Sequence, residues 1–270
     1  MRDLIATART FLFVPGDRPD RFAKAAASGA DIVILDLEDA VGPDSKDEAR
    51  EHVRSWLARG NRAVVRVNGT GTPWYDDDIT AVTDRDCAVM VPKAEDPAQL
   101  AALSRRLGAT TGIIPLIETA MGVKQAMELC MVIPVVRPAF GSVDLAAQLG
   151  VDHRSHAALR YARSAVVLAA AAAGCDAPVD GVTTTLDDDG PLHADLAHAA
   201  ELGFTGKLCI HPRQIDIAHR AFAPTDTETA WAHSVVESAR AGSVTVHDGQ
   251  MVDTPVVLRA QAIIARAQAE

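Results

Sequence analysis

The amino-acid sequence predicts an α/β protein built as a (β/α)8 barrel with a C-terminal helical extension. Two observations support this prediction. Short runs of apolar and β-branched residues recur eight times, and segments with Ala, Leu and charges at helical spacing separate them. The length of 270 residues is also one that such a barrel commonly fills as a single domain.

The eight predicted strands are nearly continuous apolar runs, which are typical of parallel strands covered on both faces. They start at Phe11, Asp31, Arg62, Ala88, Thr111, Val136, Ala177 and Phe204, with the sequences FLFVP, DIVILDLE, RAVVRVN, AVMVPK, TGIIPLIET, VRPAFGSVD, APVDGV and FTGKLCIHP.

The connecting segments have the spacing of surface helices. Helices are predicted at residues 21–28, 46–59, 97–107, 122–129, 157–173 and 192–202. An open doubly wound sheet is the alternative with the same alternation of elements. Such a sheet would be expected to carry a glycine-rich phosphate loop after its first strand, whereas the sequence there is FVPGDRPDR.

The residues after the eighth strand are not needed to close a barrel. We expect a helix over residues 227–240, an irregular or extended segment with the sequence SVTVHDGQMVD, and a last helix from about Pro255. The expected organisation is a catalytic barrel at residues 1–225 and an extension at 226–270. The extension would pack on the barrel or on a neighbouring subunit, as a lid within one functional domain.

The composition limits the classes of partner. Hydrophobic residues make up 48% of the chain, and the formal net charge of −10 disfavours non-specific nucleic-acid binding, which needs clustered Lys and Arg. The longest apolar run, at residues 165–173, is too short to span a bilayer, and no secretory signal precedes the first strand. We therefore expect a cytoplasmic protein with no nucleic-acid or membrane partner.

The four cysteines, Cys87, Cys130, Cys175 and Cys209, are scattered along the chain without a paired short spacing. This pattern is interpreted as small buried apolar residues in a reducing compartment.

Polar side chains follow most of the predicted strands at the point where each strand ends. In a barrel of this kind the carboxyl ends of the strands form one mouth, where catalysis takes place. The residues concerned are Glu38, Asp39, Arg66, Asn68, Lys93, Glu118, Asp144, Lys207 and His211. We expect them to converge on this mouth. Lys207 and His211 are assigned no role, and fixing of the loop at Pro212 is an alternative for His211.

Two of these carboxylates, Glu118 and Asp144, are candidate metal ligands. Carboxylates that meet around open space repel one another unless a proton or a cation neutralises them. Ligation by oxygen alone with few protein ligands favours Mg²⁺, and the lack of a His or Cys pair disfavours Zn²⁺. The alternative is structural: Glu118 would lie in the first turn of a helix, and Asp144 would be the N-cap of another.

Arg66 follows the apolar run AVV and is expected to enter the site from a buried strand. Its guanidinium is always charged and can bind two oxygens of one substrate group at once. An ion pair with Glu38 or Asp39 is the alternative role, and the two roles are compatible.

Short motifs in these regions resemble those of the citrate lyase β-subunit-like branch of the HpcH/HpaI aldolase family, which includes malyl-CoA and citramalyl-CoA lyases. They cover nearly the whole chain, in the family's order: LFVPGDRPDRFAKA from Leu12, DIVILDLEDAV from Asp31, VVRVNG from Val64, VPKAE from Val91, IETAMG from Ile117, FGSVDL from Phe140, GKLCIHPRQI from Gly206 and GQMVD from Gly249. The resemblance implies a TIM barrel, Mg²⁺ as the metal, and assembly as a trimer or hexamer.

The resemblance also implies roles for residues at the mouth. Glu118 and Asp144 match the metal ligands, and Arg66 matches the arginine at the carbonyl oxygens of the reacting group. Glu38 and Asp39 match an acidic pair beside the water molecules at the metal.

Further matches concern the CoA substrate and the C-terminal extension. Phe13, Arg18 and Lys24 match positions that contact CoA. Asp253 matches an acid of a C-terminal lid that acts at the active site of the neighbouring subunit, which would make oligomerisation part of catalysis.

The activity that the resemblance implies is that of a magnesium-dependent carbon–carbon lyase of the oxo-acid-lyase type. It would cleave or form a β-hydroxyacyl-CoA such as malyl-, citramalyl- or citryl-CoA, with acetyl-CoA (or a homologue) and a 2-oxo acid as the other side of the reaction. Arg66 would stabilise the carbonyl or enolate oxygen, and Asp253 would transfer the proton at the acetyl carbon.

Two alternatives to this activity stay open. A Schiff-base aldolase would use Lys93 as its nucleophile. The chain could otherwise be the β subunit of a citrate lyase complex, acting on a citryl thioester of an acyl carrier protein. The matches to CoA-contacting positions favour free CoA, as does the segment TPWYDDD, which resembles a TPFWY stretch of malyl-CoA lyases. The acyl group, the direction of the reaction and a thioesterase step are not determined by the sequence.

Overall fold

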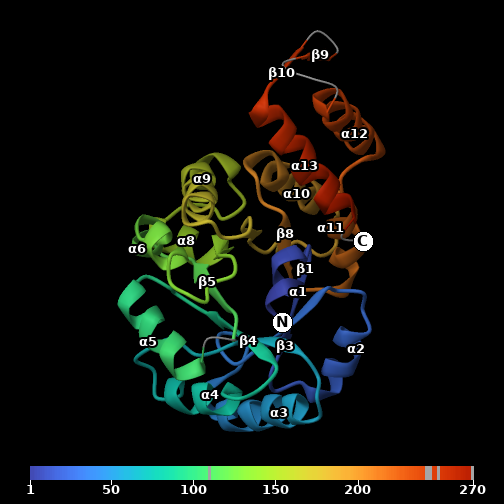
Figure 1. Cartoon of the computed structure of the whole chain (residues 1–270). Coiled ribbons are helices and arrows are strands. Elements are labelled where there is room, and N and C mark those ends of the chain that lie inside the picture. Colours follow the sequence, from blue (N-terminus) through green and yellow to red (C-terminus); the bar gives the residue numbers. More distant parts are fainter. Residues whose placement is uncertain (109–110, 241–244, 248–249, 269–270) are drawn as a thin grey trace. The chain divides into compact units, whose positions relative to one another are not determined.

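The structure, a computed structural model, describes residues 1–108, 111–240, 245–247 and 250–268. Eight parallel strands close into a barrel in the order β1 to β8 (Figure 1). The strands are β1 Thr10–Pro15, β2 Ile32–Asp36, β3 Ala63–Arg66, β4 Cys87–Val91, β5 Ile113–Ile117, β6 Ala139–Phe140, β7 Val179–Asp180 and β8 Gly206–Cys209. Leu12 of β1 lies opposite Val33 of β2 and Cys209 of β8, which closes the sheet. The predicted (β/α)8 fold is confirmed.

The interior of the barrel is apolar and is closed at the amino ends of the strands. Inward side chains such as Ile34, Val64 and Met90 form one buried cluster, which Ile5 of α1 (Arg2–Thr7) joins. The fully buried guanidinium of Arg137 donates hydrogen bonds to carbonyls at the end of α1 and to residues that lead into β7 and β8. Helix α1 was not predicted from the sequence. Because it covers the amino ends of the strands, only the carboxyl ends form the polar mouth.

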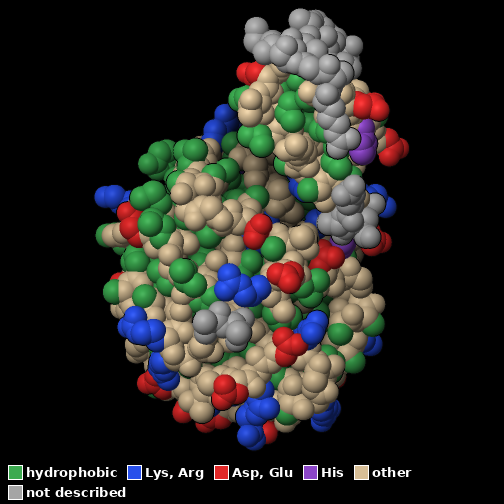
Figure 2. Space-filling view, viewed as in Figure 1, with side chains coloured by type: hydrophobic (Ala, Val, Ile, Leu, Met, Phe, Trp, Pro, Cys, Tyr) green, Lys and Arg blue, Asp and Glu red, His purple; other side chains and the backbone are tan. Residues whose placement is uncertain are grey.

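Helices surround the barrel, and Figure 1 shows α2 to α5 following one another around its outside. Their bounds are α2 Phe22–Ala26, α3 Lys46–Ala58, α4 Tyr75–Val82, α5 Pro97–Leu107, α6 Ala120–Lys124, α7 Ala126–Cys130, α8 Ser142–Leu149, α9 His156–Ala173, α10 Gly190–Leu202 and α11 Ile215–Phe222. Short 3-10 helices occur at η1 Pro19–Arg21, η2 Pro43–Ser45 and η3 Pro212–Gln214. Acidic and basic side chains are interspersed on the visible face of the barrel (Figure 2).

The sequence predicted most of these helices but not all of them. The predicted helix at 122–129 is divided at Gln125 into α6 and α7, while α4, α8 and α11 were not predicted. Three acidic residues fill the first turn of α4, where they interact favourably with the helix dipole.

The chain divides into two compact units, residues 1–221 and 222–270. The second unit contains α12 Asp226–Arg240, a hairpin of β9 Thr245–His247 and β10 Gln250–Val252, and α13 Thr254–Gln268. Its small core includes Val235, Val252 and Ile263. The predicted helices of the extension are present, and the segment expected to be irregular or extended contains the hairpin. No described helix in either unit is long and apolar enough to cross a membrane.

Candidate active site

Arg66 at the end of β3 is held by Asp36 at the end of β2. The strand register places the two residues opposite each other. The Arg66 Nε donates to Asp36 Oδ1 at 2.7 Å, and Nη2 donates to Oδ2 at 2.6 Å. The same two oxygens accept the backbone N–H groups of Glu38 and Ala40 at 2.9 and 3.2 Å. Asp36, whose side chain is 1% exposed, therefore fixes both the guanidinium and the turn after β2.

The surroundings of Arg66 stabilise its positive charge. Burial by itself disfavours the charged form, but hydrogen bonds and charges from Asp36, with further charge from Glu38 and Glu118, outweigh it and raise the pKa of Arg66 above its ordinary value. Its Nη1 lies 3.2 Å from Glu38 Oε2, so the ion pair with Glu38 is present. The guanidinium carbon also lies 4.8 Å from the centre of the Phe13 ring.

The sequence did not single out Asp36, although a signal for it exists. Asp36 and Glu38 alternate in DLED, so in an extended chain their side chains point to the same face. Asp39 points elsewhere and interacts with Lys93 instead of Arg66.

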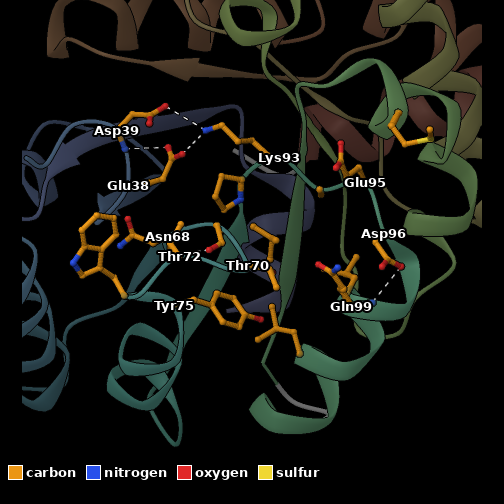
Figure 3. Close-up of a pocket in the computed structure, with 18 of the residues that line it drawn as sticks. Glu38, Asp39, Asn68, Thr70, Thr72, Tyr75, Lys93, Glu95, Asp96 and Gln99 are labelled. Carbon is orange, nitrogen blue, oxygen red and sulfur yellow. Dashed lines mark hydrogen bonds and ion pairs between the residues drawn. The ribbon is translucent and has the colours of Figure 1, made fainter. Parts of the chain in front are cut away.

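Lys93 follows β4 and connects the acids of two other strands. Its backbone N–H donates to Glu118 Oε1 at 2.7 Å, while its Nζ donates to the Glu38 carboxylate and lies 3.6 Å from Asp39 Oδ2 (Figure 3). The backbone of Lys93 is left-handed, with φ of 48°. This conformation costs a non-glycine residue about 1–2 kcal/mol, which the contacts at both ends of the residue offset.

The charge of Lys93 argues against a Schiff-base mechanism. Burial lowers the pKa of its amine, but the hydrogen bond to Glu38 and the charges of Glu38, Glu118 and Asp39 outweigh burial and raise the pKa above its ordinary value. A nucleophilic amine must be neutral, and enzymes that use one lower its pKa. The environment of Lys93 does the opposite.

Glu118 follows β5 directly and is 2% exposed. Burial first, and then the negative charge of Asp144, raise the pKa of Glu118 to about 8, while Lys93 and Arg66 act in the opposite direction. The next residue, Thr119, is the N-cap of α6 and accepts a hydrogen bond from Gly122 N, which fixes the chain beside Glu118. The fold thus brings the two predicted ligands, Glu118 and Asp144, within electrostatic reach of each other.

The structural alternatives for these two carboxylates are wrong. The N-cap of α8 is Gly141, and Asp144 lies within the helix as its third residue. Glu118 lies outside α6, because Thr119 is the N-cap there. Asp144 is half-buried in the first turn of α8, where the helix dipole stabilises a negative charge or a ligand that carries one.

Gly141 leaves the space that the Glu118 carboxylate occupies. A Cβ atom at position 141 would lie 2.4 Å from Glu118 Cβ and 2.5 Å from Glu118 Oε2. No side chain fits there without moving Glu118.

We expect Gly141→Ala to lower kcat about 100-fold, because displacing a catalytic group by about 1 Å has a cost of that size. Steady-state kinetics with a CoA thioester substrate would measure the change. The matched control is Gly42→Ala, since a Cβ at Gly42 meets no described atom within 4 Å and its φ of −67° suits alanine. Equal kcat for the two variants would contradict the assigned position of Glu118.

The chemistry of the carboxylate pair fits a magnesium ion. Both donors are oxygens. Burial and then the charge of Asp144 raise the pKa of Glu118, so a bound cation would stabilise its ionised form. Among the described residues, no group of three or more His, Cys, Asp or Glu side chains could hold a metal. Mg²⁺ needs one or two carboxylates and otherwise keeps water and substrate oxygens, so a pair is sufficient.

The raised pKa of Glu118 predicts a pH-dependent stability of the metal-free protein. Its folded-state pKa of about 8 lies above the ordinary 4.5, so between these values the folded protein binds more protons than the unfolded chain. Stability therefore falls as pH rises through this range. In thermal unfolding with a chelator, the melting temperature of the wild type should fall as pH rises, and that of Glu118→Gln should fall less. Added Mg²⁺ should restore the stability lost at pH above 8. The same dependence of melting temperature on pH in both proteins would contradict the assignment of the raised pKa to Glu118.

A cavity of about 640 Å³ adjoins the mouth between the loops after β3 and β4. Glu38, Asp39 and Lys93 line it on the side of the site, and Tyr75 of the TPWYDDD segment lies away from them in Figure 3. Trp74 of the same segment also lines the cavity.

Lys46, at the start of α3, lines the same cavity and was missed by the sequence reasoning. Its Nζ donates to the carbonyls of Leu37 and Glu38, both at 2.7 Å, and lies 5.1 Å from the centre of a Trp74 ring. It thereby holds the loop that carries the acidic pair.

The three predicted CoA-contacting residues lie on successive elements: Phe13 in β1, Arg18 at the N-cap of η1 and Lys24 on α2. Phe13 packs under Arg66. Arg18 is 45% exposed and pairs with Asp20 at 3.1 Å, and Lys24 is exposed on α2. The two cations are therefore accessible beside β1.

The expected convergence on the mouth fails for Lys207, and His211 caps a 3-10 helix just after β8. Lys207 lies inside β8, is 1% exposed, and donates to Asp180 at 2.8 Å, which also accepts from Arg163. His211 is the N-cap of η3 and forms a capping box with Gln214. Both are structural residues, and for His211 this is the loop-fixing alternative.

Asp253 belongs to the second compact unit, where it is exposed. Its Oδ1 accepts a hydrogen bond from Val256 N at 3.4 Å, at the start of α13. Gly249 of the same motif lies outside the described residues. The action of Asp253 at a neighbouring active site stays a prediction.

Comparison with known proteins identifies relatives along the whole chain. The sequence model of the family described as HpcH/HpaI aldolase/citrate lyase matches residues 9–212. A citrate lyase subunit beta-like protein of Mycobacterium tuberculosis is 38% identical over 98% of this chain and 97% of its own length. An L-malyl-CoA/beta-methylmalyl-CoA lyase of Rhodobacter capsulatus is 33% identical, over 96% of this chain and 94% of that enzyme.

A solved structure supports the same relationship. The crystal structure of protein CitE from Mycobacterium tuberculosis in complex with magnesium, acetoacetate and coenzyme A has a TM-score of 0.83 and 37% identity to this chain, covering 99% of it and 100% of that chain. The family that the sequence motifs predicted is confirmed: this chain belongs to the HpcH/HpaI aldolase/citrate lyase family.

Proposed function

We propose that this chain is a magnesium-dependent carbon–carbon lyase that cleaves or forms a β-hydroxyacyl-CoA thioester, with acetyl-CoA or a homologue and a 2-oxo acid on the other side of the reaction. The observation that carries the proposal is the arrangement of Arg66, held by both oxygens of Asp36, beside the buried Glu118 and its neighbour Asp144. A relative that acts on malyl-CoA thioesters and one solved with magnesium and coenzyme A support it.

Glu118 and Asp144 are the residues that would hold Mg²⁺, which when bound supplies a Lewis acid and a template for the hydroxyl and carboxylate oxygens of the substrate. Glu38 and Asp39 would accept hydrogen bonds from water molecules around this position. Burial raises the pKa of Glu38, and the positive charges of Arg66 and Lys93 counteract that effect, so these cations keep the acid available as an acceptor.

Arg66 would bind the thioester oxygen. A guanidinium has five N–H donors, and Asp36 occupies two of them, at Nε and Nη2. Nη1 also lies 3.2 Å from Glu38 Oε2, so the donors that neither Asp36 nor Glu38 uses would bind an oxygen that becomes negative as the carbon–carbon bond breaks and an enolate forms. Because Asp36 already holds the guanidinium in place, its donors need no reorganisation when this charge develops.

The substrate class can be tested directly. Purified protein would be assayed against malyl-, citramalyl- and citryl-CoA, with Mg²⁺ and with a chelator. Cleavage of at least one free CoA thioester only when Mg²⁺ is present is the expected result. Turnover restricted to a citryl thioester on an acyl carrier protein would favour the β subunit of a citrate lyase complex instead. Trapping of a borohydride-reduced adduct on Lys93 would overturn the metal mechanism.

Asp253 is proposed as the acid that transfers the proton at the acetyl carbon of the substrate bound to a neighbouring subunit. This role implies a homo-oligomer, proposed here as a trimer or hexamer in the cytoplasm, with residues 226–270 as the lid. It rests on the match of the GQMVD motif and on the exposure of the Asp253 side chain.

Mixed oligomers test a shared site. Glu118→Gln and Asp253→Asn protomers, co-expressed with different tags and purified through both, should regain activity that each variant lacks alone. Some sites then combine an intact Glu118 with an intact Asp253 from a neighbour. Mixed oligomers as inactive as the two single-variant oligomers would contradict the role proposed for Asp253.

A further inference from the structure

Two cysteines that are far apart in the sequence lie together at the amino end of the barrel. Cys130 is the last residue of α7, and Cys175 follows Gly174, the left-handed C-cap of α9. The backbone N–H of Cys175 donates to Ala170 O at 2.9 Å, which fixes the turn. The Cys175 thiol donates to the carbonyl of Cys130 at 3.2 Å, across a separation of 45 residues.

The two thiols also interact with each other. A hydrogen bond between them is the largest influence on both groups: it lowers the pKa of Cys175, against burial and the charge of Asp176, and raises that of Cys130. Cys175 is half-buried, whereas Cys130 is buried behind it. Cys175 is therefore the thiol that a small reagent reaches, and it is also the one that ionises first.

We infer that Cys130 and Cys175 form an oxidation site at which an intramolecular disulfide is made. A hydroperoxide is the class of oxidant that fits. The Cys175 thiolate attacks one peroxide oxygen and becomes a sulfenic acid, and the other oxygen leaves as hydroxide or alkoxide, which takes up a proton. The Cys130 sulfur then attacks the Cys175 sulfur, the S–S bond forms, and the sulfenic oxygen leaves as water with the Cys130 proton.

The geometry favours this second step over further oxidation. The Cys175 sulfur already lies 3.2 Å from the carbonyl oxygen of Cys130, so an S–S bond of about 2.05 Å would form between the side chains of two residues in contact. A sulfenic acid at Cys175 would thus meet a resolving thiol at once.

The other two cysteines provide an internal comparison. Cys87 and Cys209 are buried, their thiols contact the main-chain carbonyls of Val82 and Lys207, and burial raises the pKa of each to about 12. Neither has the accessibility or the low thiol pKa that oxidation requires. The site is therefore specific to one pair.

A disulfide here would close the chain segment 131–174, which includes β6, Gly141 and Asp144 on α8. Closing a loop of this length restricts the unfolded chain and stabilises the folded one. The pair lies at the opposite end of the barrel from the strand ends that carry Arg66 and Glu118, so the site geometry is unaffected. Oxidation is expected to raise the melting temperature and leave kcat unchanged.

Peptide mapping of the whole protein after mild hydrogen peroxide treatment tests the inference. Trypsin cleaves after Lys and Arg except before Pro, so the bond after Arg137 stays intact. Cys130 then lies in peptide 125–154, Cys175 in 164–207, Cys87 in 86–93 and Cys209 in 208–213. The expected product is peptide 125–154 linked to 164–207, two hydrogen atoms lighter than the sum, and separated again by dithiothreitol. The melting temperature should rise with the linked fraction.

Matched variants complete the test. Cys175→Ser should lose the linked peptide and the shift in melting temperature, while Cys87→Ser should keep both. Sulfinic acid at Cys175 with no linked peptide, disulfides between chains, or links that involve Cys87 or Cys209 would each overturn the inference. The wild-type map decides the question even if a variant folds poorly.

Discussion

Replacing Glu118 with Gln is expected to reduce kcat for thioester cleavage by at least about a thousandfold. The change keeps the size of the side chain and an oxygen that can accept from Lys93 N, but it removes one of the two charges proposed to hold the metal. Lewis-acid stabilisation of the transition state contributes several kcal/mol, and about 4 kcal/mol corresponds to a thousandfold in rate. Steady-state kinetics at saturating Mg²⁺ would measure the effect.

The control for this variant is Glu128→Gln, which removes the same charge from the exposed surface of α7 and should leave kcat unchanged. Glu118→Gln should remain folded, because a neutral side chain suits a buried position whose pKa is raised to about 8 by burial and by Asp144. A folded Glu118→Gln with wild-type kcat would rule out Glu118 as a metal ligand.

Asp36→Asn is the second change with a large expected effect, on both stability and rate. Each carboxylate oxygen of Asp36 accepts two hydrogen bonds, one from Arg66 and one from a backbone N–H. An amide group in place of either oxygen would face two donors, and Arg66 would lose its buried counter-charge. Breaking such a buried pair costs about 3–5 kcal/mol. Chemical denaturation would measure this loss.

The kinetic pattern distinguishes Asp36 from a metal ligand. Asp36 does not touch the carboxylate pair, so we expect Asp36→Asn to lower kcat while the affinity for Mg²⁺ stays near that of the wild type. Arg66→Lys should resemble it, since an ammonium group keeps the charge but not the two-point contact with Asp36. Asp44→Asn, on exposed η2, is the control. Wild-type stability and kcat in Asp36→Asn would contradict the positioning role.

The barrel could be predicted because its evidence is local. Eight apolar runs with helical segments between them are visible in the sequence, and parallel strands leave few other ways to bury them. The same argument placed Glu38, Arg66 and Glu118 at one mouth, and the family motifs added the identity of the metal. Spacing alone left the structural alternatives open for Asp144 and Glu118.

The residues whose roles could not be predicted from the sequence depend on contacts between distant parts of the chain. Asp36 lies within the predicted strand DIVILDLE, and its contact with Arg66 follows only from the register that sets the two residues, 30 positions apart, opposite each other. Gly141 is one residue of the predicted strand segment VRPAFGSVD, and only the structure shows that Glu118 occupies the place of its Cβ. Lys207 reads as a strand-end cation, yet it pairs with Asp180 of β7, which also binds Arg163 of α9. Three-dimensional packing decided each of these cases.

The most direct test of the account is calorimetric titration of the metal-free protein with Mg²⁺ at pH above 8, where Glu118, with a pKa of about 8, is largely ionised. The wild type and Glu128→Gln should bind one ion per chain with the same affinity. Glu118→Gln and Asp144→Asn should each bind Mg²⁺ more than about 100-fold more weakly. Loss of a residue that only supports a metal ligand weakens binding by about 10–100-fold, so the larger effect identifies the ligands themselves. Unchanged Mg²⁺ affinity in both Glu118→Gln and Asp144→Asn would contradict the claim that this pair holds the metal.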